Sequence, residues 1–112
     1  MRKPLKKDFG SEVIFAQEDW FTAGFLNIGA GKSTSIETAE HDIAFYIDDG
    51  IAIFTINGMS YEFGWGKTVL IRKGTRYSIS SAGSPIRIIK ITQEILRNKD
   101  FSGGKKFQES KD

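Results

Sequence analysis

GKSTSIETAEHDIAFYIDDGIAIFTINGMSYEFGWGKTVLIRKGTRYSISS, residues 31–81, is the stretch that decides the fold. Short runs of β-branched and aromatic residues alternate with turn residues, which is typical of a sandwich or barrel of strands. The pair Asn57-Gly58 separates two such runs, Ile51–Ile56 and Met59–Phe63. Both central residues of a type I′ turn need positive φ, which Asn and Gly tolerate. We therefore expect a two-residue hairpin at Asn57-Gly58.

The same pattern predicts strands along most of the chain. The expected strands are Val13–Phe15, Phe21–Ile28, Ser35–Thr38, Ile43–Ile47, Ile51–Ile56, Ser60–Phe63, Thr68–Ile71, Tyr77–Ser80 and Ile86–Ile91. The run Ile51–Ile56 is apolar at successive positions, whereas a strand with one wet face alternates apolar and polar residues. We expect one face to line the core and the other to be covered by a second subunit, the alternative cover being the opposite sheet's edge and the termini.

Two series of residues in this stretch have a spacing that resembles a known family. The first runs Gly31, Glu37, Ala39, Ile43, Gly50, and the second runs Gly66, Arg72, Gly74, Tyr77, Ser81. Both resemble the two motifs of the cupin superfamily, which implies an all-β jelly roll, the double-stranded β-helix of two packed antiparallel sheets. The run Lys73–Ile79, followed by Ile91-Thr92-Gln93, is further similar to the dimerising cupin of the centromere protein C family.

The resemblance also shows what this chain lacks. Glu37 and Ala39 stand where the family has its two metal-binding histidines, Ile43 stands where it has a glutamate, and Tyr77 stands where it has a third histidine. Ala and Ile have no ligand atom, and the phenol of Tyr has a reference pKa of about 10. A single carboxylate is too few ligands for a tight transition-metal site. We therefore predict a metal-independent domain with no metal and no cofactor.

Length and composition limit the remaining possibilities. With 112 residues the chain has room for one domain. We expect a basic N-terminal arm at residues 1–12, the cupin domain at 13–99 with a short helix at Thr92–Lys99, and a flexible C-terminal tail at 100–112. A net charge of +2 argues against nucleic-acid binding, and no apolar run is long enough to span a membrane. The absence of cysteine fits a cytoplasmic protein.

A small set of polar and aromatic residues forms the predicted site. Glu37, His41 and Tyr77 would supply a carboxylate, a group that titrates near neutrality and a phenol, a set able to perform acid–base chemistry. This requires the single histidine to turn into the barrel, and a surface or turn position is the alternative. For ligand binding we name Glu37, Tyr46, Trp65 and Tyr77. Arg72, Lys73 and Arg76 form a basic cluster, either solvated or in contact with an anion.

These observations leave three functions open. The first is a homodimeric, metal-free cupin that binds a small polar ligand of the sugar or carboxylate type, or that serves as an assembly or regulatory module. The second is a metal-independent isomerase, epimerase or lyase that uses Glu37, His41 and Tyr77. The third is a dimerisation domain whose barrel is filled by side chains. An open polar cavity containing His41 would favour the enzyme, and a barrel plugged by residues such as Phe45 and Ile79 would favour dimerisation.

Overall fold

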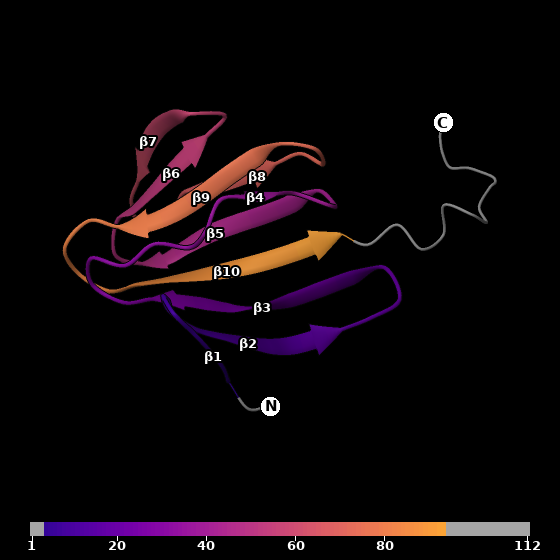
Figure 1. Cartoon of the computed structure of the whole chain (residues 1–112). Coiled ribbons are helices and arrows are strands. Elements are labelled where there is room, and N and C mark those ends of the chain that lie inside the picture. The colour runs from indigo at the N-terminus through magenta and orange to yellow at the C-terminus, as the bar shows by residue number, and fades with distance from the viewer. Residues whose placement is uncertain (1–3, 94–112) are drawn as a thin grey trace.

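The computed structural model describes residues 4–93. Figure 1 shows two stacked layers of strands, with the N-terminal strands at one margin and β10 running through the middle of the larger layer. Within residues 4–93 there is no helix that is long and apolar enough to cross a membrane. The ten strands are β1 Leu5–Lys7, β2 Gly10–Gln17, β3 Phe21–Ile28, β4 Glu37–Thr38, β5 Ile43–Asp49, β6 Ala52–Ile56, β7 Met59–Phe63, β8 Thr68–Ile71, β9 Arg76–Ser81 and β10 Ile86–Gln93.

Two antiparallel sheets make up the domain. The larger sheet has the strand order β1-β2-β3-β10-β5-β8, and the smaller one has the order β4-β9-β6-β7. Strands that follow one another in the chain often lie in opposite sheets, as β8, β9 and β10 do, so the chain winds around a common interior. The predicted all-β jelly roll of two packed antiparallel sheets is confirmed.

The core lies between the two sheets because each strand turns alternate side chains inward. On β5, Ile43, Phe45 and Ile47 are buried, while the residues between them are more exposed. Phe45 packs edge-on against Phe54 of β6 across the interior, with 5.3 Å between the ring centroids. The two rings are fully buried and fill the centre of the barrel. This packing fixes the separation of the sheets around the site described below.

The turns follow the local sequence closely. Ile56 pairs with Met59 across Asn57-Gly58, and both turn residues have positive φ, 49° and 86°. The predicted two-residue hairpin is therefore confirmed. The glycines that carry the family resemblance, Gly31, Gly50, Gly66 and Gly74, also have positive φ, between 71° and 91°. A side chain at any of these positions would strain the backbone, so the spacing of the glycines reports the positions of the turns.

The ends of the domain differ from the expectation. Residues 5–12, expected to be an arm outside the domain, form β1 and the start of β2, and Leu5 pairs with Glu12. Lys6 and Lys7 give no strand signal in the sequence, and this edge strand forms by pairing with Ser11 and Gly10 of β2. At the other end, Thr92 and Gln93 belong to β10 and not to a helix, because they pair with Thr22 and Phe21 of β3. The rest of the predicted helix and the predicted tail lie outside the described residues.

The strand that is apolar at successive positions has a simple explanation. Ala52 and Phe54 face the core and are fully buried, while Ile53 faces outward and is half-buried between its cross-strand partners Glu62 and Ser80. Thr55 on the same outer face pairs with Ser60 and Ser78. The outer face of the smaller sheet is therefore mainly polar. It does not form the extended apolar surface that the sequence of β6 alone indicates.

Candidate functional site

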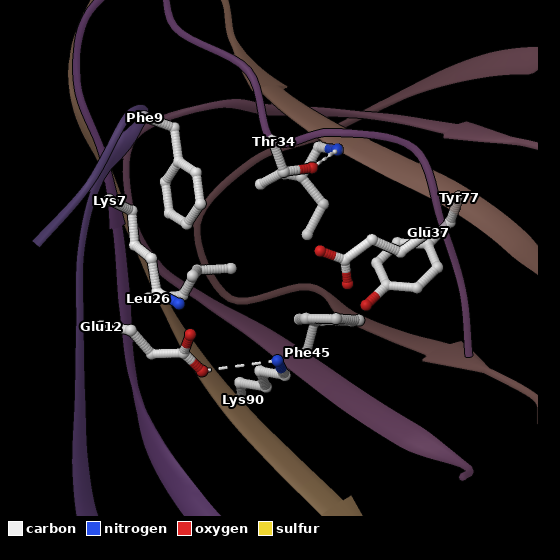
Figure 2. A pocket seen from close by; sticks show the side chains of 10 residues that line it. Lys7, Phe9, Glu12, Leu26, Thr34, Glu37, Phe45, Tyr77 and Lys90 are labelled. Atoms are coloured by element: carbon white, nitrogen blue, oxygen red, sulfur yellow. Dashed lines mark hydrogen bonds and ion pairs between the residues drawn. The ribbon is translucent and has the colours of Figure 1, made fainter. Parts of the chain in front are cut away.

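A small cavity lies at the mouth of the barrel, where β1 and β2 of the larger sheet approach β4 and β9 of the smaller one (Figure 2). Its volume is about 50 Å³. Since a water molecule takes about 30 Å³ in the liquid, the cavity has room for one or two waters. The residues that line it are Lys7, Phe9, Glu12, Leu26, Thr34, Glu37, Phe45, Tyr77, Ile79 and Lys90.

One wall of the cavity carries an ion pair. Lys90 of β10 and Glu12 of β2 both point inward, and the Lys90 Nζ lies 3.4 Å from the Glu12 Oε2. The two side chains are 25% and 22% exposed, so the pair is partly shielded from water. Lys7 also lines the cavity. The lining therefore holds two cations and, with Glu37, two carboxylates, so its formal charges balance.

Glu37 and Tyr77 occupy the opposite wall (Figure 2). They are direct cross-strand partners on β4 and β9, which places both side chains on the same face of the sheet. Burial raises the pKa of Tyr77 to about 12, with further contributions from the negative charges of Glu37 and Glu12. The phenol is therefore neutral at physiological pH. Among residues 4–93, no group forms a hydrogen bond with its hydroxyl.

His41 does not join these residues. It lies in the loop between β4 and β5, and it is absent from the lining of the cavity. Its neighbour Asp42 accepts a hydrogen bond from the backbone N–H of Lys73, at 2.8 Å, which holds this loop against the β8–β9 turn. The His41 Nδ1 is buried and has no hydrogen-bond partner among the described residues. The structure therefore brings Glu37 and Tyr77 together but leaves His41 outside the cavity.

The other predicted ligand-binding residues also lie away from the cavity. Tyr46 is on β5 between the inward-facing Phe45 and Ile47, so the alternation of the strand turns it to the outer face of the larger sheet. Trp65 lies in the loop between β7 and β8 and is 71% exposed. Neither contributes to the lining of the cavity. Tyr46 and Trp65 were predicted because they are aromatic, and residue type alone does not indicate on which face of the fold a ring lies.

The family's metal site is not formed by the residues present. Ala39 and Ile43, at two of the ligand positions, are buried and have no atom that can coordinate an ion. Ala39 instead joins the β8–β9 turn, donating its N–H to the Thr75 carbonyl and accepting a hydrogen bond from the Gly74 N–H. Within residues 4–93 there is no group of three or more His, Cys, Asp or Glu side chains positioned to hold a metal. The donor set fits a hydrogen-bonded polar cavity and not a metal centre.

Three charged residues of the cavity, Lys7, Glu12 and Lys90, were not predicted from the sequence, nor were Phe9, Leu26 and Thr34. Glu12 and Lys90 are far apart in the chain, and their contact arises because β2 and β10 flank β3 on its two sides. One signal was available for Lys90. It follows Ile86 and Ile88 on the inward face of β10, and a charge at such a position indicates a partner inside the barrel.

A jelly roll of two packed antiparallel sheets, with glycine turns at the motif positions, is the fold of the cupin class of domain. The chain is a cupin domain by fold, and a divergent one that lacks the usual metal ligands. No protein-family model matches the chain, and a search of curated proteins finds no match.

Solved structures support this assignment. The chain matches the Schizosaccharomyces pombe Cnp3 cupin domain with a TM-score of 0.70 and 25% identity, over 80% of this chain and 68% of that chain. It matches KdgF from a Halomonas species with a TM-score of 0.71 and 14% identity, over 80% and 82% of the two chains. It also matches a cupin superfamily protein from Desulfitobacterium hafniense with a TM-score of 0.69 and 19% identity, over 74% of this chain and 75% of that chain. The Cnp3 match agrees with the predicted likeness to the dimerising cupin of the centromere protein C family.

Proposed function

We propose that this cupin domain is a metal-independent assembly module that forms a homodimer through the outer face of its larger sheet. The observation that carries the proposal is an apolar surface on that face, which we call the outer apolar face. It consists of outward-facing side chains on β2, β3, β10, β5 and β8. Its residues are Val13, Phe15, Ala23, Phe25, Ala44, Tyr46, Leu70, Ile89 and Ile91.

Cross-strand register makes this surface continuous. One row passes from Val13 to Phe25, Ile89 and Tyr46, and each of these residues is the direct partner of the next. A second row, one pleat further along the strands, passes through Ala23, Ile91, Ala44 and Leu70 in the same way. Side chains at such positions touch their neighbours. The face is therefore one patch and not a scatter of separate apolar residues.

The edge of the patch suits a symmetric interface. Five strands spaced about 4.8 Å apart and two rows of side chains cover about 300 Å², which matches the largest apolar patch on a typical monomer, a patch that is often functional. At one end lies the ion pair between Arg87 and Asp48, with 2.7 Å between Nη2 and Oδ2. The Arg87 guanidinium also lies 5.0 Å from the centre of the Phe25 ring. An apolar centre with a polar rim is the usual anatomy of an interface. A two-fold axis would bring the outer apolar face of one subunit into contact with the same face of the other.

The interior of the barrel supports an assembly role over catalysis. Binding sites for small molecules measure about 300–1,000 Å³, whereas the barrel cavity measures about 50 Å³. Its charges neutralise one another, and Phe45 and Ile79 fill its floor. The alternative of an isomerase, epimerase or lyase required His41 beside Glu37 and Tyr77, and the fold keeps His41 outside the cavity. A polar ligand inside the barrel would have to displace side chains that already fill it.

The test is the oligomeric state of matched surface variants. We expect the wild-type chain, of mass 12.5 kDa, to sediment as a particle of twice that mass at micromolar concentration. Leu70→Lys and Ile91→Lys change residues of the outer apolar face that are 53% and 42% exposed, so the monomer should still fold. Met59→Lys is the control, because Met59 is 64% exposed and lies on the smaller sheet.

The expected effect is large because two-fold symmetry introduces each substitution twice. Burying one leucine is worth about 1.5–3 kcal/mol, so two copies are worth about 3–6 kcal/mol, or a rise in Kd of about 10²- to 10⁴-fold. Leu70→Lys and Ile91→Lys should therefore sediment as folded monomers, and Met59→Lys should remain dimeric. A monomeric wild type, or equal dissociation of all three variants, would contradict the proposal.

A further inference from the structure

A second hollow lies on the opposite side of the molecule from the outer apolar face, and its shape differs from that of the barrel cavity. It runs over the outer face of the smaller sheet, between the segment that leads into β4, the middle of β9 and the β6–β7 turn. Its volume is about 470 Å³, within the range of about 300–1,000 Å³ that holds small molecules. We call it the outer groove, and the residues that line it are Ile36, Thr55, Asn57, Gly58, Arg76, Tyr77 and Ser78.

The floor of the outer groove is made of hydroxyl groups. Thr55 of β6 and Ser78 of β9 are direct cross-strand partners that point outward, because Phe54 and Ile79 beside them point into the core. The Thr55 Oγ1 lies 3.0 Å from the hydroxyl oxygen of Ser60. A hydroxyl can both donate and accept a hydrogen bond, so this floor can bind a ligand that carries hydroxyl groups itself.

One end of the outer groove is rich in hydrogen-bond donors. The Asn57 Oδ1 accepts a hydrogen bond from the backbone N–H of Arg76, at 3.4 Å, and the Asn57 N–H donates to the Arg76 carbonyl, at 2.9 Å. These contacts fix the turn against β9 and leave the Asn57 Nδ2 as a donor. The Arg76 side chain is exposed, and within residues 4–93 its guanidinium has no ion-pair or hydrogen-bond partner.

The charge of the outer groove is positive. Among the described residues that line it, Arg76 is the charged one, and none is a carboxylate. Glu37 is close in sequence to Ile36 but points through the sheet to the barrel cavity, because neighbouring residues of a strand face opposite sides. Glu62 shares this outer face as the partner of Ile53 but does not line the groove, so within the groove the planar guanidinium faces solvent without a competing negative charge. This fork geometry matches a carboxylate, which it can bind through two parallel hydrogen bonds.

We propose that the outer groove binds a small carboxylate that also carries hydroxyl groups. Arg76 holds the carboxylate, Thr55 and Ser78 exchange hydrogen bonds with the hydroxyl groups, and Ile36 covers the aliphatic carbon chain. This inference is independent of the proposed dimer, because the groove and the outer apolar face lie on different sheets. Failure of either proposal leaves the other standing.

The experiment titrates ¹⁵N-labelled protein with D-gluconate and, separately, with sorbitol, while backbone amide chemical shifts are recorded. The two probes have the same carbon skeleton but differ in charge. We expect saturable shifts at residues 55, 57, 58, 76 and 78 with gluconate, and at least a tenfold weaker response with sorbitol. Arg76→Gln should lower the affinity for gluconate at least tenfold. Arg72→Gln is the matched control, because Arg72 is exposed but does not line the outer groove.

Each outcome of this experiment bears on the proposal. Saturation at the named amides that is lost in Arg76→Gln and kept in Arg72→Gln supports it. The absence of saturable shifts at millimolar gluconate overturns it, and so does equal weakening in both variants, which would indicate a general charge effect. A titration with inorganic phosphate completes the set. Phosphate binding as tight as that of gluconate would overturn the assignment to a hydroxylated carboxylate.

Discussion

The ion pair between Glu12 and Lys90 gives the sharpest quantitative test of how the barrel is closed. We consider the variants Glu12→Met, Lys90→Met and the double variant with both changes. Methionine has a length similar to that of either side chain but carries no charge. Leu26 and Phe45, which line the same cavity, offer it apolar contacts. The three variants and the wild type form a double-mutant cycle.

The magnitude follows from the geometry. For unit charges 3.4 Å apart, the separation of the Lys90 Nζ and the Glu12 Oε2, an effective dielectric constant of about 20 gives an attraction of about 5 kcal/mol. Desolvation of two partly buried groups offsets most of this attraction. We therefore expect a coupling energy of about 1–2 kcal/mol. Lys90→Met alone should cost about 2–3 kcal/mol, since it leaves two carboxylates, Glu12 and Glu37, lining one cavity with Lys7 as the remaining cation.

The double variant tests whether Glu12 and Lys90 stabilise the barrel only by neutralising each other. If the pair only neutralises itself, replacing both charges with apolar chains should bring the unfolding free energy back to within about 1 kcal/mol of the wild type. Unfolding in urea, followed by circular dichroism at one protein concentration, measures all four proteins. A coupling energy below about 0.3 kcal/mol would refute this reasoning. So would a double variant that loses the full sum of the two single costs.

Two further predictions concern the packing of the barrel. Gly24→Ala should lower the unfolding free energy by about 1–3 kcal/mol, because its Cβ would lie 2.2 Å from the Val13 carbonyl oxygen. Gly64→Ala is the control, because its Cβ would have no atom within 4 Å, and thermal melts should show no change in its stability. Tyr77→Phe should change stability at pH 7 by less than about 1 kcal/mol. Because burial raises the pKa of Tyr77 to about 12, the unfolded chain releases this proton first above pH 10, and wild-type stability falls between pH 10 and 12. The Phe variant lacks this component, so its stability relative to the wild type should rise over that interval, and a constant difference would contradict the assignment.

Local sequence was enough to locate most of the elements. The bounds predicted for Phe21–Ile28 and Thr68–Ile71 agree with β3 and β8, because both runs are rich in β-branched or aromatic residues and turn residues lie next to them. The hairpin at Asn57-Gly58 was equally accessible, since positive φ is a property of those two residues. The predicted first strand was shorter than β2, because Gly10–Glu12 carry no strong strand signal and owe their conformation to pairing with β3.

The candidate site was predicted only in part. Glu37 and Tyr77 share a wall of the cavity, as the motif spacing indicated, because the spacing encodes which strands become neighbours. The position of His41 depended on how one loop packs against the β8–β9 turn, and a hydrogen bond from Lys73 to Asp42 determines that packing. A linear sequence does not contain this contact. The same is true of Tyr46, whose side of the sheet depends on the register of β5.

The sequence by itself determined that the chain is β-rich, with glycine turns at motif spacing and with Ala39 and Ile43 at two of the family's metal-ligand positions. These properties depend on residue type and on separations of a few positions, which local sterics and coordination chemistry fix. The tertiary structure alone decided that Lys90 meets Glu12, that the apolar residues of five strands form one outer surface, and that Arg76 stands over a hydroxyl floor. Each of these depends on which distant strands pair and in which register, because a shift by one residue would turn every side chain of a strand to the other face.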